Sequence, residues 1–125
     1  MHIIDITQLT RESLPGLEHV TLAGNEQGLT TLSVWRQSIE PGAVTPPHRH
    51  DCEEVIVIEA GHGSVLIDGE TRGFGPGSTL VIPRNEVHQI VNDGPGPITL
   101  LAMLGMSPVK VFLPDGTALP LPWKT

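Results

Sequence analysis

Two histidines stand one residue apart in the segment TPPHRHDCEE, residues 45–54. Side chains at positions i and i+2 of a β-strand face the same way, so His48 and His50 would aim at one point if they share a strand. Glu54 has the same parity, and a tight turn through residues 51–53 would return it beside them on the next strand. Imidazole nitrogens and a carboxylate oxygen are ligands for a divalent metal. The spacing therefore predicts a metal site.

A fourth candidate ligand, His88, lies in the segment VHQIVN between two turn signals, PRNE and DGPG. Three neutral imidazoles and one carboxylate form a mixed set suited to Fe(II), Mn, Ni, Cu or Zn, and such a set leaves room for water or substrate. The two prolines before His48 fix φ and favour an extended approach into the strand, which lowers the entropy lost when the histidines align. Parity alone does not place His88 opposite the others.

The elements that would position these side chains are short strands separated by tight turns. Turn signals recur about every 8 to 12 residues, which is typical of an all-β sandwich or barrel. A short helix fits only in TQLTRESLPG, whereas the turns AGHG and DG predict two successive hairpins. The predicted strands are 17–23, 29–39, 53–59, 63–68, 70–74, 78–82, 87–92, 98–104 and 109–113.

Composition bounds the class of protein. The chain has 125 residues, enough for one hydrophobic core, and its 14 glycines and 12 prolines are too many for a helical bundle. A formal charge of −7 and the lack of tyrosine argue against a nucleic-acid partner. The N-terminus lacks a signal-peptide pattern, and no apolar run could span a membrane. With one cysteine and no internal disulfide, the protein is expected to be cytoplasmic.

Two segments resemble the two motifs of the cupin superfamily. Residues 42–61 match the first motif, G-x5-H-x-H-x3-E-x6-G, and residues 77–92 resemble the second, G-x5-P-x-G-x2-H-x3-N. The one departure is Asn85, where the motif has glycine, and asparagine is the best non-glycine residue for a left-handed turn. Besides the four candidate ligands, the matching residues are Gly42, Gly61, Gly77, Pro83 and Asn92.

The resemblance implies one domain over residues 1–125, an antiparallel jelly-roll β-barrel. Its core would span about 17–113, with the N-terminal segment and the proline-rich C-terminal tail packed on it. It also implies one divalent metal inside the barrel, and it supplies the placement of His88. The implied ligands are His48, His50, Glu54 and His88.

Strand parity gives candidates for the pocket walls. Ile56 shares a strand and a parity with Glu54 and is expected to point inwards. Two pairs remain open in the long strand 29–39: Trp35 with Gln37, or Val34 with Arg36. The candidate wall residues are Trp35, Gln37, Ile56, Ile90, Leu101 and Met103. Cys52 is expected in an exposed turn.

The resemblance is compatible with three kinds of function. The first is a mononuclear metal-dependent dioxygenase acting on a small organic molecule, with Glu54 as ligand or, if released, as base. The alternative is a metal-dependent binding or sensing module without turnover. A sugar isomerase or epimerase is disfavoured, because related epimerases use a tyrosine and this chain has none. The segment EEVIVIE is apolar on both parities, which together with the resemblance predicts a homodimer.

Overall fold

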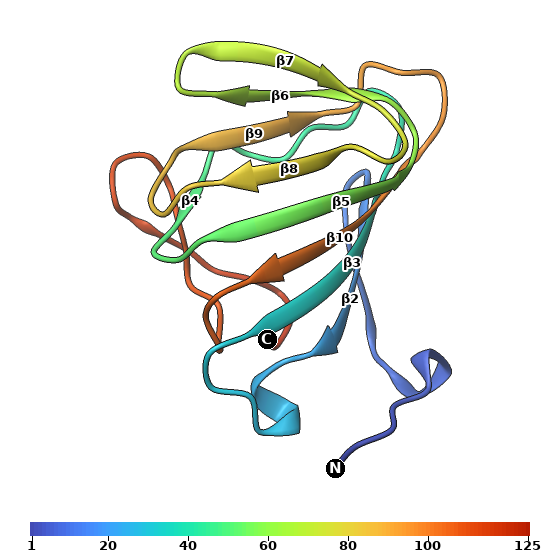
Figure 1. The fold of residues 1–125 in the computed structure, drawn as a ribbon, viewed down its shortest axis with the longest axis vertical. Helices are drawn as coiled ribbons and strands as arrows, with labels where there is room; N and C mark the ends of the chain where they lie inside the picture. The colour runs from blue at the N-terminus through green and yellow to red at the C-terminus, as the bar shows by residue number, and fades with distance from the viewer.

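The computed structural model describes residues 1–125, and antiparallel strands form the body of the molecule (Figure 1). The largest sheet has six strands, in the order β1 (Arg11–Leu14), β2 (Leu17–Ala23), β3 (Ser33–Ile39), β10 (Ile98–Leu104), β5 (Glu54–Ala60) and β8 (Thr79–Ile82). A second sheet has the order β7 (Glu70–Phe74), β6 (Gly63–Ile67) and β9 (His88–Val91). A third, small sheet joins β12 (Ala118–Leu119), β11 (Val111–Phe112) and β4 (Arg49–His50).

Helical structure is confined to two single turns, η1 (Ile6–Gln8) and η2 (Asn25–Gln27). Neither approaches the length and hydropathy that a helix needs to cross a bilayer. The prediction of an all-β jelly-roll fold is therefore confirmed.

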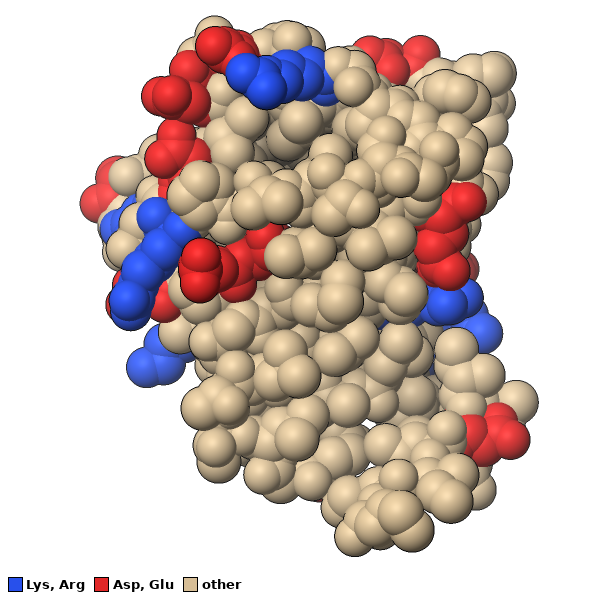
Figure 2. Space-filling view, viewed as in Figure 1, with Lys and Arg blue, Asp and Glu red and all other residues tan.

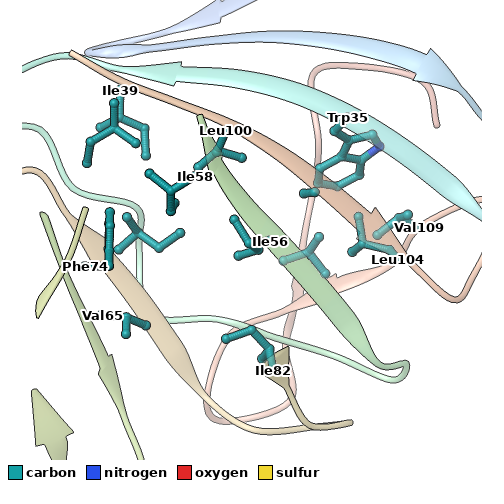
Figure 3. Close-up of a cluster of buried hydrophobic side chains, with 14 of the residues drawn as sticks. Trp35, Ile39, Ile56, Ile58, Val65, Phe74, Ile82, Leu100, Leu104 and Val109 are labelled. Atoms are coloured by element: carbon teal, nitrogen blue, oxygen red, sulfur yellow. The ribbon is translucent and has the colours of Figure 1, made fainter. Parts of the chain in front are cut away.

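The hydrophobic core lies inside the barrel because the long strands alternate buried and outward positions. In β10 the buried residues are Ile98, Leu100, Ala102 and Leu104. In β5 the same alternation buries Glu54, Ile56 and Ile58. Figure 3 shows side chains of the large sheet meeting Val65 and Phe74 of the second sheet in one cluster. Glu54 is thus the polar end of an inward row whose other members belong to this core.

Most predicted strands are present, with shifted ends. The long strand begins at Ser33 rather than at 29. In the segment where a helix was expected, η1 is the only helical turn and the following residues form strand β1. The hairpin through Asp68 and Gly69 is confirmed, and both residues have positive φ, 49° and 70°. The hairpin predicted between β5 and β6 is wrong. The chain leaves the first sheet at Gly61, so β5 pairs with β10 and β8, whereas β6 pairs with β7 and β9.

The outer face of the six-stranded sheet carries an uncovered apolar surface. Val55 is 36% exposed and its cross-strand partner Val81 is 71% exposed, beside the half-buried Met103. Figure 2, in the same view as Figure 1, shows a largely uncharged face with acidic and basic side chains along its margins. At one margin Arg36 and Glu59 form an ion pair with an N···O distance of 3.3 Å. An apolar centre with a charged rim is typical of a protein interface.

We predict that this face pairs two copies of the chain. Light scattering is expected to give twice the chain mass of 13.4 kDa, and Val55→Glu is expected to yield monomers, because it places a charge in the apolar centre. Leu66→Glu is the matched control, since Leu66 is 37% exposed on the other sheet. A monomeric wild-type protein at micromolar concentration would contradict the prediction.

Candidate metal site and ligand cavity

The four predicted ligands lie together inside the barrel. His48, His50 and His88 each place a ring nitrogen within 4.8 Å of those of the other two. Nε2 of His88 lies 3.2 Å from Oε1 of Glu54, and Nε2 of His50 lies 3.6 Å from the same oxygen. Apart from His48, which is half-buried, all of them are buried. They come from the loop before β4, from β4, from the start of β5 and from the start of β9.

His48 and His88 are held in matching ways across an antiparallel bridge. Their backbones exchange N–H···O bonds of 3.1 and 2.9 Å. Each ring donates through Nδ1 to the carbonyl two residues earlier, Pro46 at 2.6 Å and Glu86 at 2.9 Å. Since a carbonyl only accepts, Nδ1 carries the proton, and Nε2 of each neutral ring keeps its lone pair. Such an outer hydrogen bond fixes the tautomer and orientation of a metal-binding histidine.

The centre of the cluster holds polar atoms without partners. Neither the ring nitrogens of His50 nor Oε1 of Glu54 form a hydrogen bond of good geometry, although all three atoms are fully buried. Leaving buried polar groups unsatisfied costs stability. A cation bound between the imidazole lone pairs and the carboxylate would satisfy them, so the donor set fits a divalent transition metal.

A metal is bound by neutral imidazoles and an ionised carboxylate. The pKa shifts in the cluster favour these forms for every ligand except His88. Burial lowers the pKa of His48 to about 4, and the neighbouring His88 adds to this effect. Burial also lowers the pKa of His50, against the opposing charge of Glu54. Burial alone would raise the pKa of Glu54, but the three imidazoles hold it below its usual value. For His88, burial acts to lower the pKa, yet contact with Glu54 outweighs it and raises the pKa above 6.5.

These four residues border a cavity of about 230 Å³ whose walls are mainly apolar. Trp35 and Gln37 line it, which decides the parity of β3 left open by the sequence. The predicted wall of Leu101 and Met103 is wrong, because the register of β10 turns these residues outwards. The wall residues observed besides the ligands are Leu14, Leu17, Trp35, Gln37, Thr45, Pro46, Ile56, Ile90, Leu100, Ala102, Val111, Leu119, Pro120, Leu121, Pro122 and Trp123.

The C-terminal tail forms part of the cavity wall, which the strand pattern did not reveal. Trp123 stacks on His19 with ring centroids 3.8 Å apart and planes within 10°. The indole N–H of Trp35 donates to Oγ1 of Thr125 at 3.1 Å, and Oγ1 of Thr21 donates to the carbonyl of Lys124 at 2.8 Å. The aromatic residue in the segment PLPWK was the available signal, since a tryptophan in a proline-rich tail is expected to pack against the body of the protein.

Cys52 does not lie in an exposed turn. The residue is in the turn that connects β4 with β5, but its side chain is only 6% exposed and belongs to the core cluster. Burial raises the pKa of its thiol, with the charge of Glu54 acting in the same direction. The residue is therefore a packing element rather than a reactive thiolate.

The closed β fold and the imidazole cluster define a member of the cupin superfamily. More narrowly, the chain belongs to the auxin-binding protein family, whose sequence profile matches residues 2–123. The chain is 37% identical over 117 residues to auxin-binding protein 1 of Arabidopsis thaliana, an alignment that covers 85% of this chain and 59% of that protein. It is 35% identical over 130 residues to auxin-binding protein T85 of Nicotiana tabacum, covering 93% and 70%.

The chain is also similar, more distantly, to two enzymes. Gentisate 1,2 dioxygenase 1 of Aquipseudomonas alcaligenes is 31% identical over 97 residues, which cover 77% of this chain and 28% of that enzyme. The structure of the polyketide cyclase RemF from Streptomyces resistomycificus has a TM-score of 0.74 and 24% identity, covering 87% of this chain and 83% of RemF. The similarity to RemF shows a common fold alone. The chain thus spans between about a quarter and four fifths of these proteins.

Proposed function

We propose that the protein is a metal-dependent binding protein for a small aromatic or apolar carboxylic acid. The observation that carries the proposal is a buried set of three imidazoles and one carboxylate that opens into a mainly apolar cavity of about 230 Å³. This volume lies just below the roughly 300–1,000 Å³ of pockets for drug-sized ligands, so it suits a small molecule. Auxins, for which the matching family is named, are small aromatic carboxylic acids.

The net charge of the metal-loaded site determines the sign of the ligand charge that it attracts. A divalent cation bound by neutral imidazoles and the Glu54 carboxylate would keep one net positive charge. In a cavity with no other charged wall residue, that charge would attract an anion. A carboxylate could therefore complete the coordination of the metal, which would be Fe, Mn, Ni, Cu or Zn.

The apolar part of such a ligand would meet a wall suited to an aromatic ring. Trp35 and Trp123 lie edge to face with ring centroids 5.7 Å apart, and prolines of the tail flank them. Aromatic side chains and proline rings bury apolar surface at a low entropy cost. The polar end and the apolar end of the cavity thus match the two ends of an aromatic acid.

We expect indole-3-acetate to bind to the zinc-loaded protein and to lose most of its affinity when the metal is removed. Isothermal titration of the zinc-loaded and chelator-treated forms measures the difference, and indole-3-ethanol, which lacks the carboxylate, is the matched control ligand. A metal-loaded protein that binds the alcohol as tightly as the acid would contradict the role of the metal in recognition.

The second candidate is a metal-dependent dioxygenase, which the similarity to gentisate 1,2 dioxygenase 1 favours. A redox-active metal in the site would supply oxygen chemistry. Glu54 is the only carboxylate on the cavity wall, so it would be the carboxylate base if it were released from the metal. Oxygen consumption by the iron-loaded protein with aromatic acids tests this candidate, and tight binding without oxygen uptake would favour the binding protein.

A further inference from the structure

The ring of His50 is anchored less firmly than the rings of the other two imidazoles. The rings of His48 and His88 are held through Nδ1 by backbone carbonyls, whereas the ring of His50 meets the backbone of Lys110 without a hydrogen bond of good geometry. A metal ligand must be held close to its productive geometry by its surroundings. The direction of the His50 side chain therefore depends on how firmly its backbone is fixed.

The residues around His50 are tied to the turn before β9 by one residue, Asn85, through its side chain and its backbone. The amide of Asn85 accepts a hydrogen bond from Nη1 of Arg49 at 2.7 Å and donates one to Oδ1 of Asp51 at 3.1 Å. These two residues flank His50 on both sides. In addition, the backbone N–H of Asn85 donates to the carbonyl of His50 itself at 2.7 Å. Three successive residues of the β4 segment are thus bound to one residue.

Neighbouring contacts reinforce this connection. Arg84 donates through Nε to the same Asp51 oxygen at 2.6 Å, and the guanidinium of Arg49 lies 5.2 Å from the centre of the Phe112 ring. Asn85 has a φ of 62°, a conformation that glycine adopts at lower cost. An asparagine in this conformation must be supported by its contacts, and here the contacts reach the segment that carries His50.

We propose that Asn85 is a positioning residue of the metal site, which acts by holding the backbone of His50 at a fixed distance from His88. Asn85 precedes His88 by three residues on the same segment. Its bonds to residues 49–51 therefore connect the segment that carries His88 with the segment that carries His50. The inference rests on the proposed metal function, and it concerns a residue that would not touch the metal.

Asn85→Gly separates this role from a general contribution to folding. Glycine keeps the positive φ and the backbone bond to His50 and removes only the side-chain bonds. We expect the variant to bind Zn²⁺ about tenfold more weakly in a competition with a chromophoric chelator, as outer-shell substitutions do. Release of Zn²⁺ should be faster, and the visible spectrum of the Co²⁺-loaded variant should change, while the unfolding midpoint of the metal-free protein stays close to that of the wild type.

Asp68→Gly is the matched control. Asp68 is the other non-glycine residue with positive φ, at 49°, and it lies in the turn between β6 and β7. This variant should keep wild-type Zn²⁺ affinity and Co²⁺ spectrum. Equal Zn²⁺ affinity in wild type and Asn85→Gly, with or without a lower unfolding midpoint, would overturn the positioning role alone. A wild-type protein that takes up neither Zn²⁺ nor Co²⁺ would overturn the metal function as well.

Discussion

Replacing His88 with alanine is expected to weaken metal binding by about 100-fold or more, beyond the 10–100-fold typical of outer-shell changes. The variant loses one of three imidazoles whose nitrogens lie within 4.8 Å of one another, and Glu54 loses the partner 3.2 Å away. His48→Ala should have a similar effect, because its Nε2 is directed by the same kind of hydrogen bond. Elemental analysis after dialysis, followed by titration with Zn²⁺, measures both.

His62→Ala is the control for these variants. This histidine lies exposed between β5 and β6, away from the cluster, and its loss should leave one metal per chain. The unfolding midpoint of each metal-free variant shows whether the barrel is intact. If both His88→Ala and His48→Ala retain the wild-type metal content, the assignment of the ligands is wrong.

Acidification is expected to release the metal, with His88 as the first group to take up a proton. Its pKa lies above 6.5 because contact with Glu54 outweighs burial, so protons compete with the metal as the pH falls through that value. One competing proton lowers the affinity about tenfold for each pH unit. Between pH 7.5 and 5.5 the loss should be at least about tenfold, because the full effect of the proton applies only below the pKa of His88. His48 takes up a proton only at about pH 4, where its own pKa lies.

Glu54→Gln tests which charge causes this pH dependence. Without the carboxylate, the pKa of His88 should fall, because burial is then opposed only by the contacts with Glu86. The variant should bind Zn²⁺ more weakly at neutral pH, while its affinity begins to fall only at a lower pH than in the wild type. An unchanged midpoint of the pH profile would show that a group other than His88 controls metal release.

The sequence predicts the ligand residues of the metal site more completely than it predicts the strand pairing of the surrounding barrel. His48, His50 and Glu54 are close in the chain, so strand periodicity alone brings them together. His88 is different, because its position opposite them depends on the long-range bridge to His48, which only the cupin motif implied. Long-range pairing leaves little trace in local patterns.

Two wrong predictions, the hairpin between β5 and β6 and the inward face of β10, also depend on long-range pairing. The pairing of β5 with β10 and β8 could not be read from the turn that follows β5, which resembles a hairpin turn. In β10, both faces are apolar, since Leu101 and Met103 alternate with Leu100 and Ala102. The pattern therefore gives no sign of the inward side. Strands of two residues, such as β4, are too short to show a period at all.

The walls of the cavity also contain every fluorescent side chain that could report on it. The chain has two tryptophans and no tyrosine, and Trp35 and Trp123 both border the cavity. Tryptophan emission therefore originates only beside the site. Unlabelled protein should report the arrival of a ligand or of a quenching ion such as Cu²⁺ directly, with no background from distant parts of the barrel.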